Sequence, residues 1–345
     1  MFQNQSMNSN ATLYSRQDVF ESAAANIMLK VLYFFVVVLA VTANILIFYL
    51  LIRKRIKSTN FTMLLHHLLI ADTLSGISLL PYVFIDVHKL TIRNDIEGTV
   101  VCWSTIGLCF FYATGGNQIF FVCFISVFRL FKIKWRTKAA EYFTKKNIQK
   151  VSIFAWITSG CLMIPNIISW KYMAKDGYCK RHWSYPMLGT VYTCAYFVIG
   201  LLIPLVVFVI CYVLIKKTLN EHKDSLTIVN SRVVQSSKKI TNLLRILFLS
   251  FLLCWAPLLI YFFLATTTNV FPNGVKGDRI RLKFIRVAVL VAVSNTLLDP
   301  LYLFFQLKEY RDALKALLNL KPANTTKENE ITIETIASIN KKTNK

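Results

Sequence analysis

The sequence predicts an all-α membrane protein: a seven-transmembrane helix bundle with a short amphipathic cytoplasmic helix after the last span. Three observations predict this fold. The chain has 345 residues and is 55% hydrophobic, with a mean hydropathy of +0.50, whereas soluble domains are roughly 45–50% apolar. Its apolar residues gather in seven long blocks, and its basic residues concentrate between alternate blocks.

Each block is long enough to cross a bilayer as a helix. About 30 Å of hydrocarbon requires about 20 apolar residues at a rise of about 1.5 Å each. Strands of a membrane barrel would instead show roughly ten-residue alternation. The predicted spans are 27–52, 62–87, 99–128, 150–171, 187–215, 240–266 and 284–306. The third is the least apolar, because it contains Gly115, Gly116, Asn117 and Gln118.

These blocks leave little chain for a soluble domain. Residues 1–26 are expected to form an extracellular N-terminal tail, and 27–306 the seven-transmembrane domain. Residues 307–320 are expected to form the amphipathic cytoplasmic helix, and 321–345 a disordered cytoplasmic tail. The first 26 residues are polar and lack the apolar core of a cleavable signal peptide, so the first span is expected to act as the targeting signal.

Basic residues predict the orientation. The net charge is +23, and with the N-terminus outside, 13 of the 40 lysines and arginines lie in outer segments and 27 lie in inner ones. This bias follows the positive-inside rule, and the inner rim suits anionic membrane lipid. The sequence therefore predicts a multi-pass plasma-membrane protein with its C-terminus in the cytoplasm and no nucleic-acid partner. Sequons at Asn4 and Asn10 lie in the outer tail and are predicted glycosylation sites.

Two acids, Asp72 and Asp299, lie deep within apolar spans, whereas the other 15 of the 17 lie between the spans, beyond them or at a span end. An acid at membrane depth costs several kcal/mol unless it is paired or hydrated, which makes both residues functional candidates. Asn295 precedes Asp299 by one helical turn, and Asn44 lies in the first span. Two carboxylates in one cluster repel each other unless they bind a cation or share a proton. A cation site and a hydrogen-bonded packing network both remain open.

One landmark stands in each span. In order, they are Asn44, Leu68 to Asp72, Arg129, Trp156, Pro204 with Tyr212, Phe251 with Cys254-Trp255-Ala256-Pro257, and Asp299-Pro300. Together they resemble the rhodopsin-like (class A) family of G-protein-coupled receptors, over nearly all of residues 27–320. Arg129 stands where the family has the Arg of its DRY motif. Residues 251–257 match FxxCWxP, and Asp299-Pro300 is similar to the start of N/D-P-xx-Y.

The resemblance implies a receptor that binds an extracellular ligand and activates heterotrimeric G proteins by opening its cytoplasmic helix ends, with arrestin as a further partner. The residues expected to switch or to couple to the G protein are Arg129, Tyr212, Phe251, Trp255, Pro257, Pro300 and Tyr302. Proline removes a helix hydrogen bond and permits a hinge. No cofactor is implied beyond a sodium ion as an allosteric ligand, for which Asp72, Asp299 and Asn295 are the candidate site. Gln118 replaces a small polar residue that often helps to hold this ion, which weakens that interpretation.

The resemblance also implies a disulfide between Cys102 and Cys179. Cys102 lies 27 residues before Arg129, two more than is typical of the family. A bulge near Gly115-Gly116, or a shifted start of the third helix, would absorb the difference.

Two motifs depart from the family pattern. Phe128 precedes Arg129 where the family usually has Asp or Glu, so the usual inactive-state ion pair is absent. Tyr302 stands one residue early, and one residue turns a helical side chain by about 100°.

Ligand identity is less determined. The residues expected to line the pocket are Phe111, Thr114, Tyr196, Trp255, Tyr261 and Arg286. Val293 stands in place of the retinal-binding lysine, which argues against a light sensor. Arg286 and the basic outer loop favour a peptide or an acidic small molecule, and an aromatic-lined lipid pocket is the competing interpretation.

Two other function classes compete with a receptor. A transporter or ion-translocating seven-helix protein would use Asp72 and Asp299, but such folds often carry internal repeats, and we find none. An enzyme is not predicted, because GxSxG, HExxH and Walker-type motifs are absent.

Overall fold

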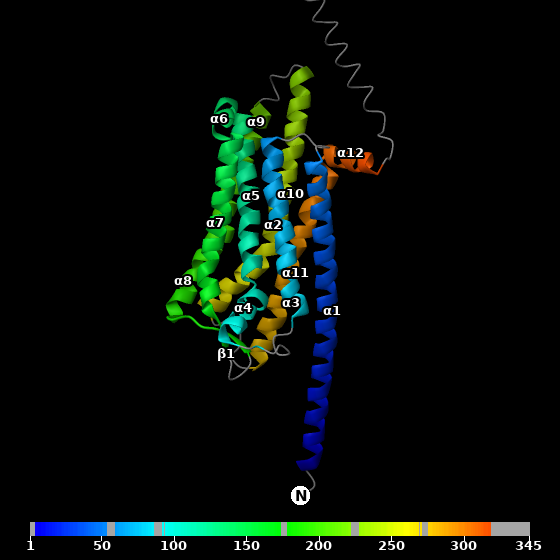
Figure 1. Ribbon diagram of the computed structural model, residues 1–345, viewed down its shortest axis with the longest axis vertical. Helices are drawn as coiled ribbons and strands as arrows, with labels where there is room; N and C mark the ends of the chain where they lie inside the picture. The colour runs from blue at the N-terminus through cyan, green and yellow to red at the C-terminus, as the bar shows by residue number, and fades with distance from the viewer. Residues whose placement is uncertain are drawn as a thin grey trace, which may run out of the picture.

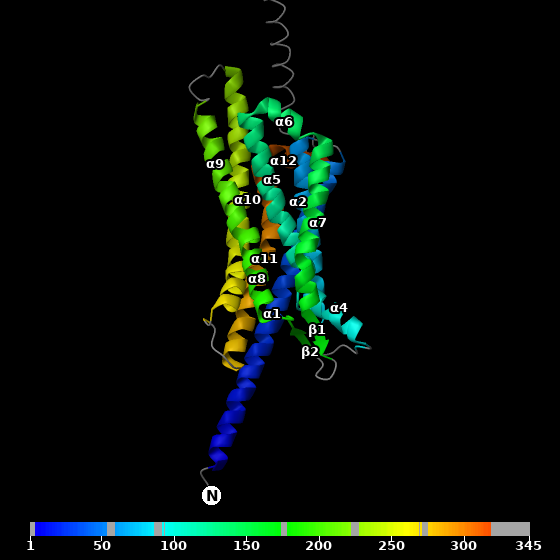
Figure 2. The ribbon, with the colours of Figure 1, turned by 90° about the vertical axis from the view of Figure 1, so that its left-hand side faces the viewer.

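The predicted seven-helix bundle is confirmed (Figures 1 and 2). The computed structural model describes residues 4–53, 59–85, 92, 94–173, 178–221, 228–268, 270 and 275–318, of which 4–23, 178, 186, 228–237 and 275–279 are described by their backbone alone. Within these residues, seven helical segments are long and apolar enough to cross a membrane. They are Ala24–Ile52, Asn60–Phe84, Asp95–Lys134, Lys145–Ser169, Met187–Glu221, Lys238–Thr267 and Ile280–Gln306.

The first helix is longer than its apolar block. Helix α1 (Asn4–Ile52) carries its backbone continuously from the predicted N-terminal tail into the first span, and Figure 1 shows it continuing past the end of the bundle. The side chains of Asn4 and Asn10 lie outside the described part of the chain. The predicted tail at 321–345 lies outside the described residues as well.

Three spans are interrupted. Span two consists of α2 (Asn60–Ser78) and α3 (Leu80–Phe84), and span three of α4 (Asp95–Thr105) and α5 (Cys109–Lys134). Span five consists of α8 (Pro186–Phe197), the π-helical turn η2 (Val198–Leu202) and α9 (Ile203–Glu221). Pro204 has no backbone N–H to donate, so the regular hydrogen-bond ladder cannot continue through it, and the turn before it widens.

The remaining spans are single helices. They are α1, α7 (Lys145–Ser169), α10 (Ile228–Thr267) and α11 (Val275–Gln306). Pro257 lies inside α10, and Pro300 lies inside α11. Both helices bury one face against the bundle, while large apolar residues elsewhere, such as Ile153, Phe154 and Ile157 of α7, are 59%, 64% and 59% exposed. This outward apolar surface suits contact with lipid, so the bundle is held by close packing of its inner faces.

Helix α5 occupies the centre of the bundle, where it packs against α2, α7, α9 and α10. Helix α11 packs against α1, α2 and α10. The central position of α5 brings its side chains into contact with most of the other spans. Residues that transmit a change of packing from one end of the bundle to the other are therefore expected along this helix.

The two ends of the bundle differ. One end carries an antiparallel hairpin, β1 (Trp170–Met173) and β2 (Tyr178–Arg181), which no sequence pattern predicted. The other end carries α6 (Arg136–Tyr142) and the amphipathic α12 (Lys308–Leu317), which lies across the bundle beside α1 and α11 in Figure 1. Arg311 of α12 donates hydrogen bonds to the carbonyl oxygens of Phe304 (3.2 Å) and Phe305 at the end of α11. These bonds satisfy carbonyls that have no partner within α11 and fix the turn into α12.

Candidate functional site

The break in span three shapes one end of the bundle. Leu108 has a positive φ of 48°, and the carbonyl oxygen of Gly107 accepts a hydrogen bond of 3.4 Å from Asn166 Nδ2 of α7. A Cβ at Gly107 would lie 2.6 Å from Nε1 of Trp170, so a larger residue would not fit. The irregularity of span three lies in this break, between Thr105 and Cys109. Gly115 and Gly116, where a bulge was expected, remain inside regular helix α5.

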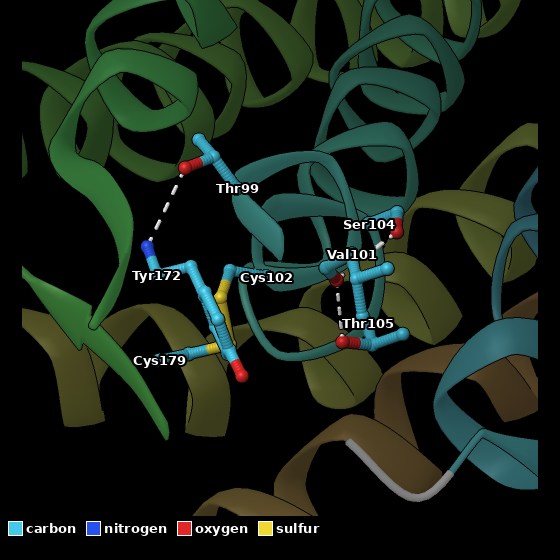
Figure 3. Close-up of a disulfide and its surroundings, with 7 residues drawn as sticks. All are labelled: Thr99, Val101, Cys102, Ser104, Thr105, Tyr172 and Cys179. Carbon is cyan, nitrogen blue, oxygen red and sulfur yellow. Dashed lines mark hydrogen bonds between the residues drawn. A yellow bond between two sulfur atoms is a disulfide. The ribbon is translucent and has the colours of Figure 1, made fainter. Parts of the chain in front are cut away.

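A disulfide joins the broken span to the hairpin, as predicted (Figure 3). The Cα atoms of Cys102 and Cys179 lie 5.5 Å apart. Beside it, the backbone N–H of Tyr172 donates to Thr99 Oγ1 at 3.4 Å. A Cβ at Gly98 would lie 2.3 Å from the Tyr172 ring, so α4 and β1 are in direct contact. The disulfide and this contact fix the hairpin over the end of the bundle.

A cavity of about 480 Å³ lies at this disulfide end. Of the described residues that line it, two are arginines, Arg181 of β2 and Arg286 of α11, and none is acidic. Most of the others are aromatic or aliphatic. They include Tyr82, Leu108, Tyr112, Trp170, Tyr192, Tyr196, Phe262, Ile285 and Val289. An apolar cavity with a few convergent polar groups is typical of a small-molecule site.

Arg181 is held in place by neutral partners. Its Nη2 donates to Asn166 Oδ1 at 3.1 Å, its Nε donates to Ser169 Oγ at 3.4 Å, and its guanidinium lies 5.1 Å from the ring centroid of Trp183. Burial lowers the pKa of the Arg181 guanidinium from its ordinary value. Arginine nevertheless stays protonated at physiological pH, so this wall of the cavity carries a fixed positive charge.

Arg286 is held from the opposite side. Its Nη1 donates a hydrogen bond to Oδ1 of Asn26 in α1, and Tyr82 lies beside its side chain. The Tyr33 hydroxyl donates to the backbone carbonyl oxygen of Arg286 at 2.5 Å. These contacts fix the outer end of α11 against α1.

Two of the six predicted pocket residues line the cavity, and four make other contacts. Tyr196 and Arg286 line the cavity. Thr114 donates hydrogen bonds to the carbonyl oxygens of Phe110 and Phe111 in its own helix, and Tyr261 stacks on Phe284. The other two, Phe111 and Trp255, stack on each other and are buried. Sequence reasoning missed Arg181, Asn166 and Tyr112, which line the cavity.

Trp255 lies in the middle of a three-ring stack. Its ring is 5.0 Å from Phe111 and 5.7 Å from Phe251, at interplanar angles of 18° and 16°. Gly115 of α5 leaves the space for it, because a Cβ there would lie 2.1 Å from Cη2 of Trp255. The stack connects α5 to α10, two residues before Pro257.

A buried polar cluster lies between the spans. Asn295 donates to Asp299 Oδ2 at 3.1 Å and accepts from Ser250 Oγ at 3.1 Å. Gln118 and Asp299 are neighbours of Asp72, and all of these residues are buried. Asn44 donates to the carbonyl oxygens of Ala40 (2.9 Å) and Thr296 (2.7 Å), which joins α1 to α11. The predicted cluster of Asp72, Asp299, Asn295 and Asn44 is therefore brought together around the centre of the bundle.

The opposite end contains Arg129, which is 8% exposed. Its guanidinium carbon lies 5.6 Å from the ring centroid of Phe61 in α2, a cation–π contact. Its Nε has no hydrogen-bond partner among the residues the structure describes. Phe128 packs instead against Phe143, at 5.1 Å between ring centroids. The residue that replaces the family's acid thus contributes to an aromatic contact and leaves Arg129 against a neutral ring.

Arg129 lines a second cavity, of about 970 Å³. Its described lining is basic, with five cationic residues and Glu309 as the acid. The cationic residues are Arg129, Lys132, Lys239, Lys308 and Arg311. A basic cavity at a helix-bundle end attracts an acidic partner.

The remaining predicted switch residues lie around this end of the bundle. Tyr212 stacks on Phe208, whose ring also stacks on Phe248 of α10 at 3.8 Å. Pro300 is buried within α11, and Tyr302 is partly buried against the core. The structure therefore gives Tyr302 a packing contact, without a hydrogen bond to Arg129 or Tyr212 among the interactions described.

Comparisons with known proteins agree with this architecture. The family described as 7 transmembrane receptor (rhodopsin family) matches residues 43–302. Somatostatin receptor type 4 of Rattus norvegicus is 23% identical over 305 residues, covering 86% of this chain and 74% of that receptor. Somatostatin receptor type 2 of Mus musculus is 22% identical over 316 residues, covering 89% and 81%. Somatostatin receptor type 5 of Rattus norvegicus is 23% identical over 304 residues, covering 86% and 79%.

Proposed function

Because the chain belongs to the rhodopsin family of seven-transmembrane receptors, we propose that it is a G-protein-coupled receptor that binds an extracellular ligand in its disulfide-end cavity and activates heterotrimeric G proteins at its Arg129 end. The observation that carries this proposal is the pair of cavities at opposite ends of one bundle, with Arg129 buried in the second. Members of this family are receptors and not enzymes. A site at each end is the arrangement that a receptor needs.

The proposed orientation places the disulfide end outside the cell. Cys102 and Cys179 form a disulfide, which persists in an oxidising compartment. The opposite end carries the basic cavity and α12, and the positive-inside rule assigns such an end to the cytoplasm. The protein is then a multi-pass plasma-membrane protein with its N-terminus extracellular.

The proposed mechanism is a shift between two populations of the bundle. A ligand in the outer cavity contacts Tyr112 and Phe262, which lie next to the stack of Phe111, Trp255 and Phe251. Displacing Trp255 would let α10 pivot at Pro257, since a proline-containing helix bends there. The pivot would widen the cavity around Arg129 for the tail of a G protein. Arrestin is proposed to use the same cavity.

The ligand is proposed to carry an acidic group. The relatives are named for somatostatin, but at 22–23% identity their ligand is not transferred to this chain. Arg181 and Arg286 in an apolar cavity support a peptide or a small molecule with a negative charge. A purely apolar lipid would leave both arginines without a counter-charge, which disfavours the lipid-pocket interpretation.

A direct test compares nucleotide exchange with ion flux. The full chain in vesicles, mixed with purified heterotrimeric G proteins, is expected to accelerate GTPγS uptake when a screened acidic ligand is added. The same vesicles are expected to show no proton or sodium current. A current that depends on Asp72 and Asp299, without nucleotide exchange on any G protein, would establish the transporter alternative and refute the receptor.

The buried acids are proposed to hold a sodium ion as an allosteric ligand. Both carboxylate oxygens of Asp72, Oδ1 of Asp299 and Oγ of Ser75 lack a hydrogen-bond partner among the described residues. These oxygens are hard ligands of the kind that sodium takes, so the donor set fits. Asn295 is engaged with Ser250 and Asp299, which makes it a positioning residue in this arrangement.

Asp72→Asn is expected to remove a stabilising effect of sodium. Replacing choline chloride by sodium chloride at equal ionic strength should raise the melting temperature of the wild-type protein by about 2–4 °C, for a concentration of roughly ten times the dissociation constant. The Asp72→Asn variant should show no rise. Thr73→Val is the control, because the Thr73 hydroxyl bonds the Leu69 carbonyl of its own helix at 2.7 Å. An equal sodium shift in Asp72→Asn would leave the packing network as the explanation.

A further inference from the structure

We propose that the ligand of the outer cavity is a small organic anion with two acidic groups, one bound by Arg181 and the other by Arg286, and an apolar body between them. This inference rests on the proposed receptor function and specifies the ligand class of that site. Four features of the cavity carry it: its charge, the placement of its two cations, its lining and its volume.

The charge of the cavity calls for an anion. Both arginines are protonated throughout the physiological range, and no acidic residue is among the described residues that line the cavity. Their hydrogen-bond partners, Asn166, Ser169 and Asn26, are neutral side chains. Neutral partners orient a guanidinium but do not balance its charge. Two cations in an apolar cavity therefore gain most from carboxylate ligands, which guanidinium groups bind with two parallel hydrogen bonds.

The placement of the arginines favours two acidic groups over one. Arg181 is anchored to α7 through Asn166 and Ser169, and Arg286 is anchored to α1 through Asn26. Figure 1 shows α7 and α1 on opposite sides of the bundle. Each guanidinium is therefore tethered to a different helix, on a different side of the bundle. A ligand with an acid at each end satisfies both.

Most of the remaining lining is apolar in its chemistry. Tyr192 donates its hydroxyl to the Leu162 carbonyl, and Tyr196 donates its hydroxyl to the Tyr112 carbonyl, both at 3.1 Å. These hydroxyl protons are used within the protein and are not available to a ligand. Ile285, Val289 and Phe262 add apolar surface. The middle of the ligand should therefore be aliphatic or aromatic.

The cavity volume sets the size of the ligand. About 480 Å³ lies in the range of roughly 300–1,000 Å³ that holds compact organic ligands. Leu108, which lines the cavity, makes no side-chain cap for α5. The backbone N–H groups at the start of this helix therefore add partial positive charge to the cavity wall at Leu108. The cavity thus fits a molecule the size of a medium-chain diacid.

Length-matched probes test this proposal. The diacids adipate, suberate and sebacate are compared with the monoacids hexanoate, octanoate and decanoate and with the diamides adipamide, suberamide and sebacamide. Binding to the purified full chain in lipid nanodiscs is measured by calorimetry and by the shift of the melting temperature. At least one diacid is expected to bind, its monoacid roughly tenfold more weakly or worse, and its diamide not at all.

Two charge-removing variants have matched controls. Arg181→Gln and Arg286→Gln should each weaken the best diacid by roughly 10–100-fold, to the level of the monoacid. Lys180→Gln and Lys283→Gln remove the same charge from exposed neighbours on β2 and α11 and should change binding less than twofold. If a glutamine variant does not fold, Arg181→Lys and Arg286→Lys keep the charge and should weaken binding by a smaller factor.

The outcomes separate this proposal from the receptor function. Failure of every diacid to bind the wild type, or diacid binding that neither arginine variant weakens, overturns the two-acid ligand. Binding of acidic peptides but of no diacid overturns it too. If only uncharged or cationic molecules drive nucleotide exchange, the proposed receptor function stands and the proposed diacid ligand is refuted. Diacid binding without exchange on any G protein would keep the ligand class and refute the receptor.

Discussion

Arg129→Ala is expected to abolish nucleotide exchange on G proteins while leaving ligand binding unchanged. Arg129 is the most buried cation in the described lining of the basic cavity, at 8% exposed, and it contacts Phe61 through its guanidinium. Removing it takes away the charge at the deepest point of the proposed docking site. Arg129 lies at the opposite end from the outer cavity, so the affinity for a ligand there should stay within about twofold. GTPγS uptake and calorimetric ligand binding on the same preparation measure both.

Lys132→Ala is the matched control. Lys132 lines the same cavity one turn along α5, but its side chain is exposed. Its removal lowers the positive charge of the cavity by the same amount and should reduce exchange only a few-fold, since exposed charges contribute little. Arg129→Lys should lose most of the activity, because a lysine cannot reproduce the planar guanidinium. Normal exchange by Arg129→Ala would contradict the placement of the G-protein site at this end.

Gly115→Ala is expected to raise ligand-independent nucleotide exchange roughly tenfold or more and to lower the melting temperature. The added Cβ would lie 2.1 Å from Cη2 of Trp255, so the indole must move. The ring is stacked between Phe111 and Phe251, and its displacement breaks both contacts. Overpacking of this kind costs about 1–3 kcal/mol. If the added Cβ destabilises the closed bundle by this amount and leaves the open bundle unchanged, the ratio of open to closed protein rises by roughly 5–150-fold.

Gly116→Ala is the control for helix propensity and expression. A Cβ at Gly116 would lie 3.4 Å from Ser159 Oγ, which is ordinary contact. Both substitutions replace glycine by alanine inside α5, so both gain the same intrinsic helix stability of about 1 kcal/mol. Gly116→Ala should therefore match the wild type in exchange and be equally or more stable. Equal behaviour of the two variants would show that Trp255 does not control the bundle through this contact.

The spans and their landmarks could be predicted because they depend on local properties. Seven apolar blocks identify seven helices regardless of how the helices pack, and Pro257 and Pro300 mark their own positions in the chain. The helix ends were less predictable. Span three extends to Asp95 and Lys134, beyond the apolar block at 99–128, because its polar end residues can stay helical in water.

The break in span three could not be assigned from sequence. The expected irregularity was a bulge near Gly115-Gly116 or a shifted start of the third helix, and Gly107 was not among the expected sites. The structure shows that Gly115 serves the contact with Trp255, whereas Gly107 accommodates the break against Trp170. Both roles depend on residues from other helices. Only the tertiary packing distinguishes them.

Only some of the cavity residues could be predicted, because the others depend on tertiary packing in the same way. Arg286 was identifiable because it stands at the outer end of the seventh span, beside the basic outer loop that favours an acidic ligand. Arg181 lies next to Lys180 in a basic outer loop, and nothing local distinguishes the two. The hairpin pairs Arg181 with Trp170. The Arg181 side chain donates hydrogen bonds to Asn166 and Ser169 of α7. Register in a two-stranded sheet decides which of two neighbouring cations reaches the cavity.

The contact between Arg129 and Phe61 has a consequence for how the closed bundle responds to acid. A carboxylate partner would become neutral on acidification and release the arginine, whereas a phenyl ring has no proton to gain. Arginine itself keeps its charge at any cytoplasmic pH. The contact that holds Arg129 in this conformation is therefore independent of any protonation step at the residue that makes it.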